Sequence, residues 1–115
     1  MTETQFTDQV IDLARMAGWL VSHNRGNMRR HIQGNVGLPD LVMVHPEREI
    51  ILFAELKVGK GMPTAEQLRW LDALANCYDS HSPDTHLIVR IWRPEDELQI
   101  ISTLTGTRQS AKVRT

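Results

Sequence analysis

The sequence predicts a single α/β domain in which a small mixed β-sheet is flanked by helices, in the order α-β-β-β-α-β-α. Three observations support this fold class. The chain has 115 residues, which is room for one hydrophobic core. Apolar residues make up 41% of it, a fraction typical of folded globular proteins. Helix-like and strand-like apolar patterns alternate along its length, as they do in α/β folds.

The first predicted element is an amphipathic helix that ends at a glycine. Apolar residues recur at helical spacing from Phe6 to Ala17, and Gly18 stands where a C-terminal cap belongs. Extended backward, the same stripe includes Glu3, so an acid lies at the end of the buried face. Residues 19–21 are then expected to form a short strand, and residues 24–37 a flexible basic loop.

Two strands joined by a tight turn come next. Residues 41–44 and 50–57 are strand-like, and residues 45–48 supply the turn of a hairpin. The second strand is apolar on both faces until its end, which predicts a central strand covered on both sides. Because side chains alternate along a strand, Glu55 and Lys57 emerge from one face at its C-terminal end.

The second half of the chain predicts one more strand between two helices. A helix opens at Thr64, runs to about Tyr78, and carries Gln67 on its inner stripe. Residues 86–92 predict a fourth strand, and Pro94 with three acids after it starts a last helix. We expect the domain to span residues 1–105 and the basic tail, residues 106–115, to be disordered.

Charge and cysteine usage limit the class of protein. The net charge is only −1, yet residues 22–37 hold three arginines and no acid. Such a segment can bind phosphates, although solvated loops are the simpler interpretation. No apolar run reaches the roughly 18–20 residues that a membrane span needs, and acids interrupt the N-terminal segment. The single cysteine, Cys77, fits a reducing cytosol, so we expect a cytoplasmic protein that makes no membrane contact.

The strongest chemical signal joins the two strands of the predicted hairpin. Asp40 heads the first strand and would lie beside Glu55, near the end of its antiparallel neighbour. Two neighbouring carboxylates repel each other unless a cation lies between them, and hard oxygen ligands suit Mg²⁺ or Mn²⁺. Lys57 shares the face of Glu55 and can reach an attacking water. These are the parts that phosphodiester hydrolysis needs. The alternative is a surface salt bridge, which contributes little to stability.

These residues resemble the signature of PD-(D/E)XK nucleases, and the wider pattern is similar to the VRR-NUC family of that superfamily. The resemblance extends from about residue 2 to residue 104. The matching residues are Glu3, Gly18-Trp19, Gly37-Leu38-Pro39-Asp40-Leu41, Phe53-Ala54-Glu55-Leu56-Lys57, Gly61, Gln67 and Trp92-Arg93-Pro94.

The resemblance implies a restriction-endonuclease-like core and a set of site residues. Asp40, Glu55 and the backbone carbonyl of Leu56 would bind Mg²⁺ or Mn²⁺, and Lys57 would position the attacking water. Glu3 would approach the metal directly or through water. Gln67 would contact the active site, although Thr64 and Gln67 also fit a capping box at the start of the helix. The candidate DNA contacts are Arg25, Arg29, Arg30, Lys60 and Arg93.

The resemblance also implies a function. Stand-alone relatives resemble junction resolvases of phages and bacteria, so we expect a metal-dependent DNA endonuclease that selects branched DNA and acts as a homodimer. If a phage encodes it, the protein would work in the host cytoplasm. We expect no small-molecule cofactor. The alternatives are a flap or nicking nuclease in phage replication or repair, and a non-catalytic DNA-binding module with the same fold.

Overall fold

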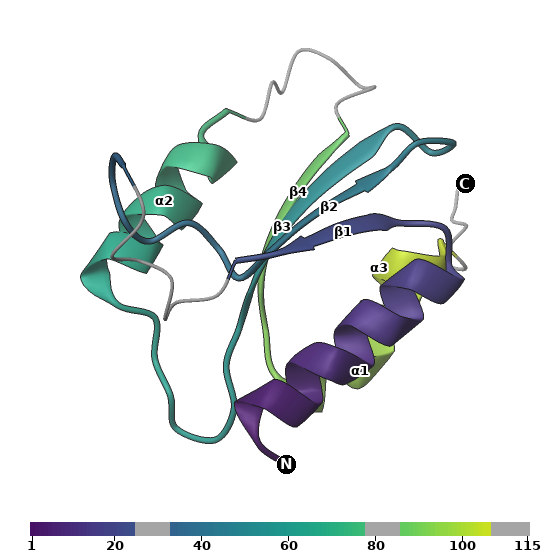
Figure 1. Cartoon of the computed structure of the whole chain (residues 1–115), viewed down its shortest axis with the longest axis horizontal. Coiled ribbons are helices and arrows are strands. Elements are labelled where there is room, and N and C mark those ends of the chain that lie inside the picture. Colours follow the sequence, from purple (N-terminus) through teal and green to yellow (C-terminus); the bar gives the residue numbers. More distant parts are fainter. Residues whose placement is uncertain (25–32, 78–85, 107–115) are drawn as a thin grey trace.

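The computed structural model describes residues 1–24, 33–77 and 86–106 (Figure 1). The predicted order of elements is confirmed, with a short 3-10 helix added before the last helix. The elements are α1 (Glu3–Met16), β1 (Leu20–His23), β2 (Leu41–His45), β3 (Ile50–Leu56), α2 (Ala65–Ala75), β4 (Leu87–Trp92), η2 (Pro94–Asp96) and α3 (Glu97–Thr105). Three predicted features, namely the basic segment 25–32, Tyr78 and the tail after Gly106, lie outside the described residues.

The four strands form one mixed sheet in the order β1-β2-β3-β4. The pairs β1–β2 and β2–β3 are antiparallel, whereas β3 and β4 are parallel and are connected through α2. Strands β1, β3 and β4 therefore run in one direction, and only β2 runs in the other. As a result, the C-terminal ends of three strands meet the start of β2 at a single edge of the sheet.

The hydrophobic core lies between the sheet and the pair α1 and α3, which cover one face, while α2 lies on the other side (Figure 1). From the sheet, alternate residues of β2 and β3 enter this core, as period-two alternation requires. From the helices, Phe6, Val10 and Ala14 of α1 meet Ile100 and Leu104 of α3.

The expectation that β3 is covered on both faces is wrong for part of its length. On the α2 side, Ile51 of β3 is 45% exposed and the neighbouring Val44 of β2 is 37% exposed. The physical reason is the length of α2, since eleven residues of helix span only about 16 Å. It packs along β4 and leaves the beginning of β3 open. Glu55, at the other end of β3, is fully buried.

The hairpin turn is anchored to the ends of both core helices. His45, which was expected in the turn, is the buried last residue of β2, and its Nε2 donates to the carbonyl of Ala17 at 2.8 Å. The Nδ1 of His45 accepts the Arg48 amide, so this pattern of hydrogen bonds places the donor proton on Nε2. Arg48 in turn donates to the carbonyl of Leu104 at 3.1 Å, at the C-terminus of α3. These bonds fix the β2–β3 turn against the C-terminal ends of α1 and α3.

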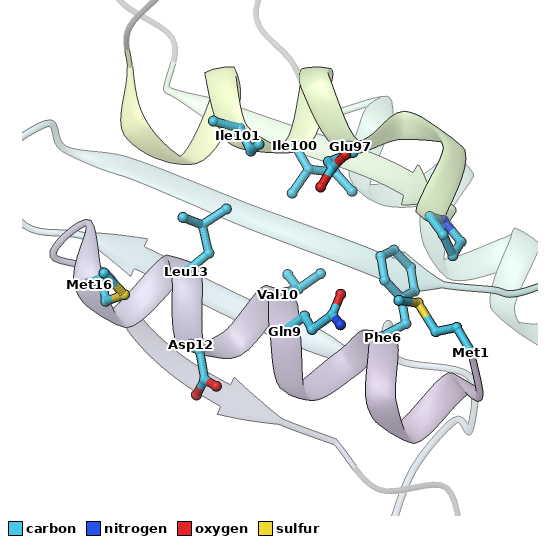
Figure 2. Close-up of a pocket in the computed structure, with 11 residues that line it drawn as sticks. Met1, Phe6, Gln9, Val10, Asp12, Leu13, Met16, Glu97, Ile100 and Ile101 are labelled. Carbon is cyan, nitrogen blue, oxygen red and sulfur yellow. The ribbon is translucent and has the colours of Figure 1, made fainter.

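A hollow of about 580 Å³ lies between α1 and α3, on the face of the sheet that these two helices cover. Figure 2 shows Phe6, Val10 and Leu13 of α1 directed toward Ile100 and Ile101 of α3. None of the predicted catalytic, metal-binding or DNA-binding residues lines this hollow. Within the described part of the chain, no helix is both long and apolar enough to cross a membrane.

Candidate metal and catalytic site

The β2–β3 hairpin brings Asp40 and Glu55 together. The register pairs Leu41 with Ala54, so the next pair along the ladder is Asp40 and Glu55. The backbone amide of Asp40 donates to Glu55 Oε1 at 3.2 Å, and the amide of Leu56 donates to Asp40 Oδ2 at 3.0 Å. These two reciprocal hydrogen bonds hold each carboxylate against the backbone of the opposite strand.

Glu55 is a buried acid with one incompletely satisfied oxygen. Its side chain is fully buried, and Oε2 accepts no hydrogen bond of regular geometry from the described residues. Lys57 Nζ lies 3.2 Å from Oε2 and forms an ion pair with it. The pKa of the Glu55 carboxyl is raised to about 7, chiefly because burial penalises the charged form and also because the Asp40 charge is near. The Lys57 ammonium opposes this shift.

The donor set fits a hard divalent cation. Two carboxylates on neighbouring strands, close enough for the Asp40 charge to raise the pKa of Glu55, supply oxygen ligands of the kind that Mg²⁺ and Mn²⁺ prefer. A cation would also remove the repulsion that helps to raise the pKa of Glu55. Asp40 and Glu55 could therefore hold such an ion, and the backbone carbonyl of Leu56 stays a predicted third ligand.

Glu3 does not join the two carboxylates in this structure. It lies in the exposed first turn of α1. Among the described residues, no group of three or more histidine, cysteine or acidic side chains is gathered as a metal site. A direct or water-mediated approach of Glu3 to a metal therefore stays a prediction.

Gln67 forms the capping box that its spacing from Thr64 suggested. Its Oε1 accepts the Thr64 amide at 2.8 Å, and the Thr64 hydroxyl accepts the Gln67 amide at 3.1 Å. This pair of bonds starts α2 and occupies the amide oxygen of Gln67. Its contact with the active site stays a prediction.

The predicted DNA contacts fall into three groups. Arg25, Arg29 and Arg30 lie outside the described residues. Lys60 is exposed in the turn after β3, where a phosphate could reach it. Arg93 is half-buried, and its guanidinium donates to the carbonyls of Gly59 at 3.2 Å and Gly61 at 2.8 Å.

The loop that leads to Asp40 is held by residues that sequence reasoning did not select. The Asn24 amide donates to the Asp40 carbonyl at 2.7 Å, and Asn24 Nδ2 donates to the Leu38 carbonyl at 3.0 Å. Trp70 of α2 donates through Nε1 to the carbonyl of Val36 at 3.0 Å. No motif marks Asn24 or Trp70, because each acts through a carbonyl that any residue could supply.

The backbone geometry at position 37, three residues before Asp40, requires a glycine. Its φ is +110°, which favours glycine, and a Cβ built on it would lie 2.6 Å from the carbonyl carbon and oxygen of Glu66. The loop therefore packs backbone to backbone on the first turn of α2. Gly37, the first residue of the matching stretch Gly37-Leu38-Pro39-Asp40-Leu41, is therefore needed for packing against α2.

The small mixed sheet with helices on both sides is consistent with a restriction-endonuclease-like α/β fold. A solved structure described as a "VRR_NUC domain protein" matches this chain with a TM-score of 0.52 and 17% sequence identity. The match covers 90% of this chain and 85% of that one. At 17% identity this likeness establishes the fold, and it supports the VRR-NUC resemblance at the level of the fold. Neither a scan against protein-family models nor a search of curated proteins found a match.

Proposed function

We propose that this chain is a VRR-NUC-type nuclease that hydrolyses DNA phosphodiester bonds with Mg²⁺ or Mn²⁺. The observation that carries the proposal is the group Asp40, Glu55 and Lys57 at one strand end, in which Glu55 is fully buried beside a second carboxylate and pairs through Oε2 with the Lys57 ammonium. A surface salt bridge does not describe this group, because a buried charge is costly and a second acid beside it adds repulsion. The shared fold of a VRR_NUC domain protein supports the same assignment.

Each residue of the group has a role that follows from its position. Asp40 and Glu55 would hold the cation, which when bound would neutralise phosphoryl charge and lower the pKa of water. Lys57 is half-buried and its ammonium reaches the space directly beside Glu55, where it can orient the attacking water. By analogy with the nucleases that this chain resembles, the water oxygen would bond to phosphorus as the bond to the 3′ oxygen breaks. The attacking water loses a proton and the leaving oxygen takes one up, so the products would be a 5′-phosphate and a 3′-hydroxyl.

The preferred substrate in this proposal is branched DNA, such as a four-way junction. A domain built on one four-stranded sheet has little surface for reading bases, so DNA shape is the more accessible signal. Cutting two strands of a junction takes two such groups, and a homodimer supplies them. Lys60 and the arginines of the basic segment would contact phosphates.

Cleavage of labelled four-way junction, flap and linear duplex DNA tests this proposal, each with Mg²⁺, with Mn²⁺ and with EDTA. We expect metal-dependent cutting of the junction, lost by at least about 100-fold in Asp40→Asn and Lys57→Ala. The matched control is Asp72→Asn, an exposed acid of α2, which should cut as the wild type does.

The other outcomes separate the alternatives. Cutting of flaps or linear duplex in place of junctions would keep the chemistry and indicate a repair or replication nuclease. Binding of DNA without cutting in either metal would indicate a non-catalytic module. Wild-type cleavage by either catalytic variant would contradict the assigned mechanism.

A further inference from the structure

The two outer strands of the sheet each end in a side chain that reaches back toward the candidate active site. Asn24 is the first residue after β1, and Arg93 is the first residue after β4. Because β1, β3 and β4 run in the same direction, both residues arrive at the edge where β3 ends and β2 begins. That edge carries Asp40, Glu55 and Lys57.

Asn24 holds the segment that contains Asp40. Its backbone amide binds the carbonyl of Asp40 itself, and its side-chain amide binds the carbonyl of Leu38 two residues earlier. The Asp40–Leu41 peptide and the Leu38–Pro39 peptide before it are thus fixed from the end of β1. Its carboxylate is fixed from β3 by the Leu56 amide.

Arg93 holds the turn that follows Lys57. Its planar guanidinium forms two hydrogen bonds to carbonyls two residues apart, those of Gly59 and Gly61. Lys57 itself is tied to the same strand end, since its amide donates to the Trp92 carbonyl at 3.0 Å. Arginine suits this task because its donors form a rigid fork, whereas a lysine ammonium is a point charge.

We propose that Asn24 and Arg93 are positioning residues for the cleavage reaction proposed above, one for the Asp40 segment and one for the Lys57 turn. This inference rests on the proposed function and revises the predicted role of Arg93 from phosphate contact to support. Neither side chain has to touch the substrate. A displacement of about 1 Å at a reacting group can cost on the order of 100-fold in rate, so bonds to the backbone on either side of that group matter.

Steady-state cleavage by Asn24→Ala, Arg93→Ala and Arg93→Lys separates positioning from DNA binding. We expect kcat to fall about 10- to 100-fold in all three, with KM and the DNA dissociation constant in EDTA within about twofold of wild type. Arg93→Lys keeps the charge and loses the fork, so it should behave like Arg93→Ala. The matched controls are Ser22→Ala on β1 and Arg90→Lys on β4, both exposed, which should keep wild-type kcat.

A second readout does not depend on turnover. Direct titration with Mn²⁺, followed by electron paramagnetic resonance of the free ion, should show about tenfold weaker binding in Asn24→Ala, because residues that support metal ligands commonly affect affinity this much. Thermal unfolding checks that each variant is folded. Asn24→Asp, which keeps the size of the side chain, replaces the alanine variant if that one does not fold.

Three results would overturn the inference. The first is wild-type kcat in Asn24→Ala or Arg93→Ala. The second is a raised DNA dissociation constant with unchanged kcat in Arg93→Ala, restored by Arg93→Lys, which would make Arg93 a phosphate contact. The third is unchanged Mn²⁺ affinity in Asn24→Ala. Failure of the proposed function would be recognised separately, because the wild-type chain itself would then not cut DNA. In that case the Mn²⁺ affinity of Asn24→Ala, compared with wild type, would still test the role of Asn24.

Discussion

At the scale of single residues, Glu55 shows how one side chain can indicate an absent ligand. A fully buried glutamate ordinarily has its charge balanced by partners, because an unpaired charge is costly to bury. Here the pairing is incomplete, and the neighbouring Asp40 adds repulsion. A divalent cation bound there would remove both problems, which is the physical basis for the proposed metal site.

The raised pKa of Glu55 predicts a pH-dependent contribution to stability. The pKa is about 7 in the folded chain against an ordinary 4.5, so the folded state holds the proton more tightly. The stabilising contribution of Glu55 is therefore complete below pH 4.5 and is lost as the pH rises through 7. We expect the unfolding free energy of the wild type, relative to Glu55→Gln, to fall on the order of 2 kcal/mol from pH 4.5 to pH 8 in EDTA.

Thermal and urea unfolding at pH 4.5, 6 and 8 measure this difference. The exposed acid Glu95 supplies the control, and Glu95→Gln should run parallel to the wild type across the range. With Mn²⁺ present the trend should reverse, because the ion binds the deprotonated carboxylate and stabilises the folded chain more at pH 8 than at pH 6. Identical pH profiles for wild type and Glu55→Gln would contradict the assignment of the shift to this residue.

At the scale of elements, the packing of the Gly37 loop on α2 sets the position of Asp40. We expect Gly37→Ala to destabilise the fold by about 1–3 kcal/mol more than Gly34→Ala and to reduce cleavage. Both glycines have positive φ, +110° and +103°, so backbone strain is similar. A Cβ at Gly37 would collide with the backbone of Glu66, whereas a Cβ at Gly34 meets nothing within 4 Å.

Urea unfolding of the two variants, with cleavage measured beside it, isolates the contribution of the contact. The comparison removes the strain common to both positions. Equal losses of stability in the two variants would mean that the contact with α2 contributes nothing and that conformation alone requires a glycine at position 37.

Much of the element order could be predicted from sequence because it depends on local rules. Alternation places Glu55 and Lys57 on one face, and a short turn makes residues 41–57 a hairpin, so the contact between Asp40 and Glu55 follows from neighbouring strands alone. Asn24 could not be found this way, and Arg93 was predicted only as a DNA contact and not as a donor to the turn after Lys57. Their partners are backbone carbonyls supplied by other parts of the fold, which leave no residue pattern.

Gln67 and Ile51 mark two further limits of sequence reasoning. A capping box and an active-site contact predict the same glutamine, and the sequence alone does not choose between them. An apolar strand predicts burial, yet Ile51 is exposed because the one helix on its side is too short to reach it. In both cases the outcome depends on where α2 lies.

At the scale of the whole molecule, the described part of one chain offers one candidate catalytic group, so the proposed paired cutting of a junction predicts a dimer. The chain mass is 13.1 kDa, so we expect a species of about 26 kDa, twice that value, by sedimentation or light scattering at the concentrations used for cleavage.

A cruciform plasmid reports the consequence of pairing. Two cuts within one binding event give linear plasmid, whereas independent single cuts give nicked circles first. Linear product from the first turnover would agree with a dimer that resolves junctions. A 13 kDa species with only nicked product would instead favour the nicking-nuclease alternative.

The mixed direction of the strands also bears on the order in which the chain folds. Asp40 and Glu55 are 15 residues apart and meet through a hairpin, whereas the bond from Lys57 to Trp92 closes a segment of 35 residues that includes α2. Closing a short loop costs less entropy than closing a long one. We therefore expect the two acids to approach each other before β4 pairs with β3. We expect the same order during synthesis, because the ribosome releases the hairpin before β4.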